Sequence, residues 1–442
     1  MNINIVPISR LNGTLWAPGS KSYSHRAFIA AALSKGVSIL RNPLTTGDVA
    51  VTIELLRKIG VKILKKEDNS YLVVREADSF QSTKGILDCK NSGTTMRFLS
   101  ALSLLVEEGL SLTGEFLDKN RPIVPLLEAL KNLGANYKRT KTKIHIKRVN
   151  HSCDPIQIVG NISSQFISAL LMICPILYCD NNCFIHIKTT TPLVSYPYIQ
   201  ITKEVLDSFE IAIQEIIQPD NTAKYSIRCA QNYRPQVYDI PGDFSSIAFL
   251  IAAGVLTKTD SKITIQNLDF NKPQGDKKFL EILEEMGANI EVEENNHQLT
   301  VYGNIYKHPL TGINIDCQDI PDLFPILSII GAFAKGKTFL YNASHLRYKE
   351  SDRIAIVSRE LQKLGIKVKE NTDSLIVYHS ETLNGSVINH ENDHRIAMAF
   401  IVACLFAGST SKMNNIEIIN DSYPDFLTHL KQIGANIEFE KS

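Results

Sequence analysis

Residues 283–292, LEEMGANIEV, decide the fold of this 442-residue chain. The first half carries apolar residues at helical spacing, Gly287 is a typical helix stop, and the last residues alternate as a strand does. The same helix–glycine–strand junction recurs along the chain. Its further copies are LLRKIGVKI (55–63), ALKNLGANY (129–137), LQKLGIKVK (361–369) and LKQIGANIEF (430–439).

A sixth, degenerate copy is VLDSFEIAI (205–213), in which Glu210 stands at the glycine position. Six repeats of about 74 residues account for the whole chain. The period is too long for a simple solenoid, so each repeat is expected to be one α/β unit, with strands such as KITIQNL (262–268) and HQLTVYG (297–303). We expect the repeats to group by threes into two domains, with a boundary at about Asp239–Gly242.

A second helix is expected in each repeat, opening with Ser, Asn, Asp or Gly and then turning strongly apolar. Because the apolar residues run nearly all round these helices, they are predicted to be buried. The six segments are 19–33, 91–105, 163–173, 242–254, 319–333 and 392–406. A helix N-terminus also presents unpaired N–H groups and partial positive charge, so several of them together would attract phosphate or carboxylate.

The composition limits the classes of function. With 47 basic and 46 acidic residues the formal net charge is +1, so no global basic field argues for nucleic acid as a partner. No apolar run reaches membrane-spanning length, and the first ten residues lack the regions of a signal peptide.

The eight cysteines have no C-x-x-C spacing; the nearest pair, Cys179 and Cys183, flanks an expected Asp-Asn-Asn turn. Scattered thiols favour a reducing cytoplasm.

Local clusters of polar and basic residues stand at several of the predicted helix starts. Lys21, Ser22 and Arg26 open one helix, with Ser22 and Arg26 four residues apart and hence on one face. Gly93 permits close approach of the backbone to a ligand, and arginine suits a carboxylate or phosphate. The other polar or basic residues at such positions are Arg97, Arg121, Ser163, Ser164, Gln165, Ser195 and Tyr198.

The densest cluster is HLRYKESDR (345–353). A salt-bridged helix surface is the usual meaning of such a run, but apolar residues follow at once, so part of the cluster is expected to face inward. Lys349 and Glu350 beside arginines supply the ingredients of proton transfer among bound anions. Asp322, at a further predicted helix start, is a candidate base.

The stretch HENDHR (390–395) matches the H-E-x-x-H zinc signature. A zinc peptidase would need both histidines on one helical face. Asn392 and Asp393 are strong caps and weak helix formers, so the helix is expected to begin at about His394, leaving His390 in the preceding strand or turn. No metal is therefore predicted here.

Together these segments resemble 5-enolpyruvylshikimate-3-phosphate synthases from residue 18 to about 400. The motifs are PGSKSYSHR, NSGTTMR, NRP, SSQFISALLM, LVSYPYIQIT, PGDFSS, QGD, IPD, YKESDR and NDHRIAMAF. The resemblance implies an inverted α/β barrel-like fold with two domains of three repeats, residues 1–19 plus 241–442 and residues 20–240, and helix N-termini facing an interdomain cleft. It also implies transfer of the enolpyruvyl group of phosphoenolpyruvate to the 5-hydroxyl of shikimate 3-phosphate, without metal or cofactor, in a monomer.

The resemblance also assigns roles. Lys21 would touch both substrates, Asp322 and Lys349 would manage the attacking hydroxyl, and Glu350 the proton at C3 of phosphoenolpyruvate. The residues implied for shikimate 3-phosphate are Ser22, Arg26, Ser163, Ser164 and Ser195, with Gln165 nearby. Those implied for phosphoenolpyruvate are Gly93, Arg121, Arg353 and Arg395, with His394 beside them. His345 stands where many relatives place an Asn or Glu contact to the shikimate ligand.

One departure from the family concerns phosphoenolpyruvate. Asp421 occupies the place of a lysine that usually helps to hold this substrate, so either another cation such as Lys412 serves or binding is weaker. A homologue that binds shikimate phosphate without turnover is thus one alternative. A UDP-N-acetylglucosamine enolpyruvyl transferase is another, but that family typically has Lys-Asn where this chain has Lys21-Ser22, and a reactive cysteine that the loop 113–122 lacks.

Overall fold

The computed structural model describes residues 1–180 and 183–440 and divides them into two compact units. Unit 1 comprises Met1–Ser20 and Pro241–Ser442, and unit 2 comprises Lys21–Ile240. Each has its own hydrophobic core. Among the described residues, no helix is both long and apolar enough to cross a bilayer. Two residues of the turn predicted between Cys179 and Cys183, at 181 and 182, lie outside the described part.

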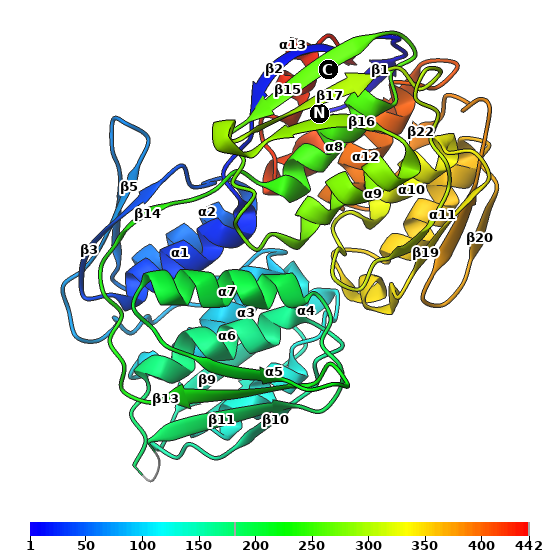
Figure 1. The fold of residues 1–442 in the computed structure, drawn as a ribbon. Coiled ribbons are helices and arrows are strands. Elements are labelled where there is room, and N and C mark those ends of the chain that lie inside the picture. The colour runs from blue at the N-terminus through cyan, green and yellow to red at the C-terminus, as the bar shows by residue number, and fades with distance from the viewer. Residues whose placement is uncertain (181–182, 441–442) are drawn as a thin grey trace. The chain divides into compact units, whose positions relative to one another are not determined.

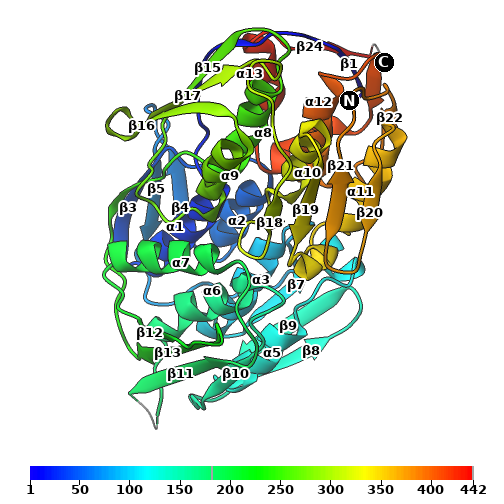
Figure 2. The same cartoon turned by 45° about the vertical axis from the view of Figure 1, so that its right-hand side comes forward.

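Unit 2 contains three four-stranded sheets, ordered β14-β3-β5-β4, β6-β7-β9-β8 and β10-β11-β13-β12 (Figure 2). Its strands are β3 (Gly36–Arg41), β4 (Lys62–Lys65), β5 (Tyr71–Arg75), β6 (Leu87–Asp88), β7 (Leu110–Thr113), β8 (Ala135–Arg139), β9 (Lys143–Arg148), β10 (Ile156–Ile158), β11 (Phe184–Thr189), β12 (Gln214–Ile217), β13 (Ala223–Arg228) and β14 (Val237–Asp239). Its α-helices are α1 (Lys21–Leu33), α2 (Gly47–Lys58), α3 (Gly93–Leu102), α4 (Glu115–Asp118), α5 (Val124–Lys131), α6 (Ser164–Ile173) and α7 (Tyr196–Ser208).

Unit 1 repeats this plan with sheets β16-β17-β15-β2, β18-β19-β21-β20 and β22-β23-β1-β24 (Figure 1). Its strands are β1 (Ile3–Val6), β2 (Asn12–Trp16), β15 (Ser261–Gln266), β16 (Asn289–Glu293), β17 (Gln298–Gly303), β18 (Asn314–Asp316), β19 (Lys337–Tyr341), β20 (Val368–Glu370), β21 (Leu375–Tyr378), β22 (Val387–Ile388), β23 (Ser411–Met413) and β24 (Asn436–Phe439). Its α-helices are α8 (Phe244–Val255), α9 (Lys278–Met286), α10 (Phe324–Phe333), α11 (Arg353–Lys363), α12 (His394–Cys404) and α13 (Phe426–Gln432).

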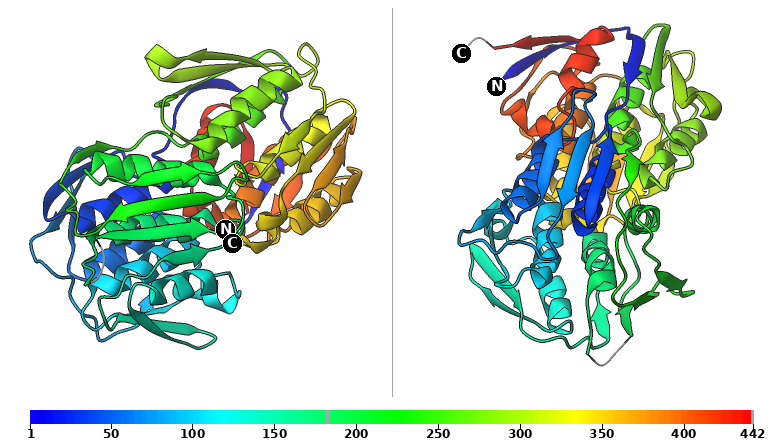
Figure 3. Two further views of the ribbon diagram at one scale, coloured as in Figure 1. Left: turned by 60° about the horizontal axis from the view of Figure 1, so that its bottom comes forward. Right: turned by 90° about the vertical axis from the view of Figure 1, so that its left-hand side faces the viewer.

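Every sheet combines one parallel and two antiparallel pairings, so the six repeats share one topology. The N-terminal strand β1 completes the last sheet by pairing with both β23 and β24, which places the first and last strands side by side in unit 1 (Figure 3). The predicted α/β repeats, grouped by threes, are confirmed.

The helix–strand junctions confirm the motif that decided the fold. All five glycines have positive φ, between 80° at Gly134 and 111° at Gly434. Glu210, in the degenerate copy, adopts the same left-handed conformation at φ 61°. Glycine reaches this conformation without the steric cost that a side chain adds, which explains its use at the other five junctions.

The apolar helices are buried over most of their length, as predicted, and in unit 1 α8, α10 and α12 pack on one another. Ser92, Ser163 and Asp393 cap α3, α6 and α12 by accepting backbone N–H groups. The predicted start of α10 was wrong: this helix begins at Phe324 with Leu323 at the N-cap position. Proline in the first turn suits that start, and the carboxylate of Asp322 is bound by arginines instead.

The cysteines contradict a second prediction. Cys153 and Cys179 form a disulfide, so the prediction of eight scattered thiols was wrong. The two residues belong to loops on either side of β10 and α6 that only the fold brings together.

Candidate functional site

In unit 2, three helix N-termini carry most of the predicted binding residues. Lys21 is the first residue of α1, and its ammonium lies 2.6 Å from the carboxylate of Asp48. Ser163 caps α6 and Ser164 begins it. Ser195 stands before α7 in a left-handed conformation, and its buried hydroxyl has no recorded hydrogen-bond partner within the described residues.

Arg26 is a buried cation surrounded by neutral acceptors. Its Nε donates to Thr202 Oγ1 at 2.7 Å, and its Nη atoms donate to Ser168 Oγ and to the carbonyls of Ser22 and Tyr198. No carboxylate within the described residues pairs with this guanidinium, and burial lowers the pKa of Arg26 to about 10. A positive charge in such surroundings is stabilised when an anion arrives.

A second cationic group forms where α3 begins. An ideal Cβ built on Gly93 would lie 3.0 Å from Arg121 Nη2 and 3.1 Å from Arg97 Nη1, so the missing side chain lets both guanidiniums reach the helix start. Both arginines also lie over the ring of Phe116, each with its Cζ 5.0 Å from the centroid. Gln165 joins α6 to this group, since its Oε1 accepts from Arg97 Nη1 at 2.5 Å.

In unit 1, Arg353 organises the acidic residues. Its side chain is only 1% exposed, and it donates to Asp322, Glu350 and Asp393 at 2.8–3.0 Å. A hydrogen bond to the carbonyl of Pro321 adds to these. Arg353 begins α11 and Asp322 precedes α10 in the same repeat, whereas Asp393 caps α12 in the next, so one guanidinium joins two repeats.

Asp322 also contacts Arg395, whose Nη2 lies 3.4 Å from its Oδ2. Burial alone raises the pKa of this carboxyl, but the charges of Arg395, Arg353 and Lys349 together hold it well below its ordinary value. An ionised carboxylate held this way is a weak base until a ligand changes its partners.

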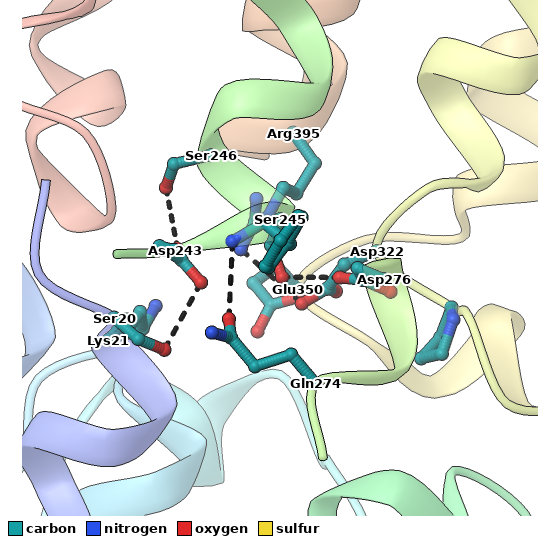
Figure 4. Close-up of polar contacts among 12 residues, drawn as sticks. Ser20, Lys21, Asp243, Ser245, Ser246, Gln274, Asp276, Asp322, Glu350 and Arg395 are labelled. Atoms are coloured by element: carbon teal, nitrogen blue, oxygen red, sulfur yellow. Dashed lines mark hydrogen bonds and ion pairs between the residues drawn. The ribbon is translucent and has the colours of Figure 1, made fainter. Parts of the chain in front are cut away.

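Asp276 and its neighbours were missed by the sequence reasoning, although QGD was among the motifs. Asp276 Oδ2 accepts from Ser245 at the start of α8, whereas its buried Oδ1 has no recorded partner among the described residues (Figure 4). Burial and the negative charge of Asp322 raise the pKa of Asp276 to about 7. Two neighbouring carboxyls therefore differ in protonation, a pattern common at functional sites.

Asp243 stands near this pair at the N-cap of α8. It accepts from Ser246 at 2.6 Å and from Ser20 at 3.2 Å, and burial raises its pKa (Figure 4). Gln274 stabilises the start of α8, because its side chain accepts from Phe244 N and donates to Gly242 O. No sequence signal separates these acids from ordinary helix caps, because their altered pKa comes from burial.

His345 is buried in a 3-10 turn, and neither ring nitrogen has a recorded partner among the described residues. Burial, reinforced by Lys349 and Arg353, lowers the pKa of His345 to about 3. The ring is thus neutral near neutral pH, with one nitrogen able to donate and the other to accept.

His394 is the first residue of α12, as predicted, and is buried beside Arg395. His390 lies in the preceding turn, where Nε2 is 2.8 Å from Asn414 O and Nδ1 accepts from Asn392 N. Within the described residues, no group of His, Cys, Asp or Glu has an arrangement able to hold a metal ion. The zinc interpretation has no structural support.

A further sequence hypothesis concerns Lys412. Lys412 lies on strand β23, where its ammonium pairs with Glu440 at 2.9 Å. It is therefore engaged on the sheet surface. Cys89 is fully buried, and burial raises the pKa of its thiol, which does not suit the reactive cysteine of the alternative transferase.

The chain's sequence matches a known family over most of its length. The family model of EPSP synthase (3-phosphoshikimate 1-carboxyvinyltransferase) matches residues 5–430. The 3-phosphoshikimate 1-carboxyvinyltransferase of Methanococcus maripaludis is 40% identical over 97% of this chain and 98% of its own. That of Methanocaldococcus jannaschii is 39% identical over 97% of both chains. The chain belongs to the EPSP synthase family and is a transferase of the shikimate pathway.

Solved structures agree on the fold. An EPSP synthase from Acinetobacter baumannii superposes with a TM-score of 0.81 at 23% identity, covering 100% of both chains. The enolpyruvyl transferase NikO from Streptomyces tendae gives 0.80 at 18% identity, covering 100% of this chain and 99% of its own. At these identities the likeness concerns the fold alone.

Proposed function

We propose that this enzyme transfers the enolpyruvyl group of phosphoenolpyruvate to the 5-hydroxyl of shikimate 3-phosphate and releases phosphate. The observation that carries the proposal is Arg26, a buried guanidinium whose hydrogen-bond partners in the described part of the chain are neutral acceptors. Such a residue suits a highly charged anionic substrate. The family match and the relatives' names supply the substrate class, and the cation groups explain how a nearly neutral chain would bind two polyanions.

We assign the binding of shikimate 3-phosphate to unit 2. The phosphate would accept from Ser163, Ser164 and Ser195, whose hydroxyls stand at helix starts where backbone N–H groups and the helix dipole favour anions. Ser22 and Arg26 would hold the rest of this substrate, with Gln165 nearby. The neutral ring of His345 in unit 1 suits a hydroxyl, because it can both donate and accept a hydrogen bond.

The candidates for phosphoenolpyruvate, implied by the family resemblance, are Gly93 and Arg121 in unit 2 and Arg353 and Arg395 in unit 1, with His394 beside them. Lys21 would touch both substrates. Because Arg353 donates to three carboxylates, we assign it chiefly to positioning these acids.

The chemistry has two steps. In the first, the substrate hydroxyl attacks C2 of phosphoenolpyruvate while C3 receives a proton. In the second, phosphate leaves as C3 loses a proton. Asp322 and Lys349 would manage the hydroxyl proton and Glu350 the C3 proton. A phosphoenolpyruvate carboxylate bound at Arg395 would weaken the contact between Arg395 and Asp322, raise the pKa of Asp322 and make it a stronger base.

The test is phosphate release with both substrates. We expect turnover by the wild type and a loss of about a hundredfold or more in Lys21→Ala and Glu350→Gln. The exposed residues Lys58 and Glu294 supply matched controls, and Lys58→Ala and Glu294→Gln should keep full activity. Equal inactivity of wild type and variants, with shikimate 3-phosphate still bound, would establish the non-catalytic alternative.

Turnover of UDP-N-acetylglucosamine in place of shikimate 3-phosphate would show the other transferase. Unchanged activity in a chelator is expected, since no step uses a metal. A monomer located in the cytoplasm completes the proposal, to be checked by sedimentation and by cell fractionation.

A further inference from the structure

Five of the eight cysteines lie in one repeat of unit 2, between residues 153 and 229. Cys153 and Cys179 are joined, and Cys229 Sγ lies 3.3 Å from Cys179 Sγ. A thiol in contact with a sulfur of a disulfide has the starting arrangement for exchange, in which a thiolate attacks one sulfur and displaces the other.

A fourth cysteine continues this row of sulfurs. Strands β11 and β13 pair with Phe184 opposite Arg228, so the next pair along is Cys183 and Cys229, and Cys229 N donates to Cys183 O at 2.9 Å. Cα atoms of such a hydrogen-bonded pair lie about 5.5 Å apart, within the range that disulfides span. Cys183 is exposed, whereas Cys153 and Cys179 are buried.

Arg148 stands at the other end of the row. Its Nη2 donates to Cys153 Sγ at 3.6 Å, and the guanidinium is anchored by the carbonyls of Leu133 and Tyr178. A neighbouring cation stabilises a thiolate, and a stabilised thiolate leaves a disulfide faster. The bond between Cys153 and Cys179 is therefore prepared to break with Cys153 as the leaving group.

We propose that Cys153, Cys179, Cys229 and Cys183 form a thiol–disulfide exchange relay that connects a buried disulfide with small thiols in solution. In the first step, Cys229 thiolate attacks Cys179 Sγ, the Cys179–Cys229 bond forms, and Cys153 departs as a thiolate beside Arg148. In the second, Cys183 thiolate attacks Cys229 Sγ and Cys179 departs as a thiolate. Each step makes one S–S bond and breaks one, so no oxidant is needed.

The relay ends at the exposed Cys183–Cys229 disulfide. A small-molecule thiol can attack it there, and two such thiols leave as their own disulfide when Cys183 and Cys229 are reduced. The reverse sequence carries oxidation inwards from a small disulfide. Burial and the nearby Cys183 raise the pKa of Cys229 above its ordinary value, and the charge of Arg148 offsets part of this increase. The thiol of Cys174 is also close to Cys229 and Arg148.

The relay lies at the opposite end of α6 from the proposed phosphate-binding residues. Ser163 and Ser164 stand at the N-terminus of this helix, and Cys174 and Cys179 follow its C-terminus. The inference is therefore independent of the proposed function, and exchange should leave transfer activity unchanged.

The experiment maps disulfides by mass spectrometry. The full chain is oxidised with a small disulfide, incubated at about pH 8.5, where an ordinary cysteine is half ionised, quenched with acid, alkylated and digested. We expect three linkages in the wild type: 153–179, 179–229 and 183–229. In Cys229→Ser only the first should remain, and its reduction by a small thiol should slow at least about tenfold.

The matched control is Cys174→Ala, which removes a neighbouring buried thiol outside the row and should exchange as the wild type does. The relay is overturned if the wild type shows only the 153–179 linkage, or if Cys229→Ser is reduced as fast as the wild type. The linkage pattern of the unmutated chain decides the matter even if a variant folds poorly.

Discussion

Replacing Asp276 by asparagine should change how the stability of unit 1 depends on pH. The pKa of Asp276 rises from its ordinary 3.8 to about 7 on folding, because the carboxyl is buried beside Asp322. The folded state thus retains a proton that the unfolded chain loses, so stability falls as pH rises from about 4 to 7. Asparagine cannot ionise and lacks this decline.

The size of the effect follows from the shift. Raising the pKa from 3.8 to about 7 lowers the unfolding free energy by about 4 kcal/mol once the pH exceeds the folded pKa, since each tenfold change in proton affinity is worth about 1.4 kcal/mol. Part of this is already present at pH 5. The unfolding free energy of Asp276→Asn, relative to the wild type, should therefore increase by about 3 kcal/mol between pH 5 and 8.

The chain offers a selective probe for this measurement. Its single tryptophan is Trp16, on strand β2 of unit 1, so tryptophan fluorescence during urea unfolding reports on the unit that contains Asp276. Glu294→Gln removes an exposed carboxylate from the same unit and serves as the control. A difference between Asp276→Asn and wild type that stays constant from pH 5 to 8, or grows as the pH falls, would refute the reasoning.

Three further predictions concern the binding residues. Arg353→Met leaves three carboxylates without their shared partner and should destabilise unit 1 by about 3–5 kcal/mol in the same fluorescence assay; a change within about 0.5 kcal/mol would contradict this. Arg395→Ala should raise KM for phosphoenolpyruvate about tenfold or more, whereas His390→Ala should change kinetics little; the reverse result in steady-state assays would count against the site. Gly93→Ala should raise the same KM by displacing the guanidinium of Arg121, with little change in melting temperature; an unaltered KM would count against that contact.

Much of the fold was predictable because its signals are local. Each of the six junctions can be recognised from a helical pattern that stops at a residue in left-handed conformation. Glu210 adopts this conformation although it is not a glycine. Caps such as Ser92 and Asp393 were predictable for the same reason, since the bond joins residues two or three apart.

What the sequence could not show depends on contacts between distant segments. The disulfide joins Cys153 to Cys179 through the packing of two loops. The raised pKa of Asp276 depends on burial and on Asp322, which lies 46 positions further along the chain. Asp322 itself looked like a helix cap, but the attraction of two arginines outweighed the weaker hydrogen bond available at a helix start.

The six repeats use one structural position for two opposite kinds of chemistry. In unit 2 the residues at the starts of the apolar helices are neutral or basic, as with Lys21, Ser92 and Ser163, so the positive ends of those helices stay available to anions. In unit 1 the same position carries carboxylates. Their negative charges offset the helix dipoles and hold Arg353 and Arg395 in place.

The carboxylates at the helix starts of unit 1, those of Asp243, Asp322 and Asp393, have different kinds of partner. Asp393 still accepts backbone N–H groups of α12 and adds a bond to Arg353. Asp243 accepts from two serine hydroxyls, and Asp322, which precedes α10, is bound by two arginines. A carboxylate bound by cationic side chains can gain basicity when a substrate takes those cations, whereas one bound by backbone cannot. If phosphoenolpyruvate binds Arg395 as proposed, Asp322 is the carboxylate of this set that gains basicity.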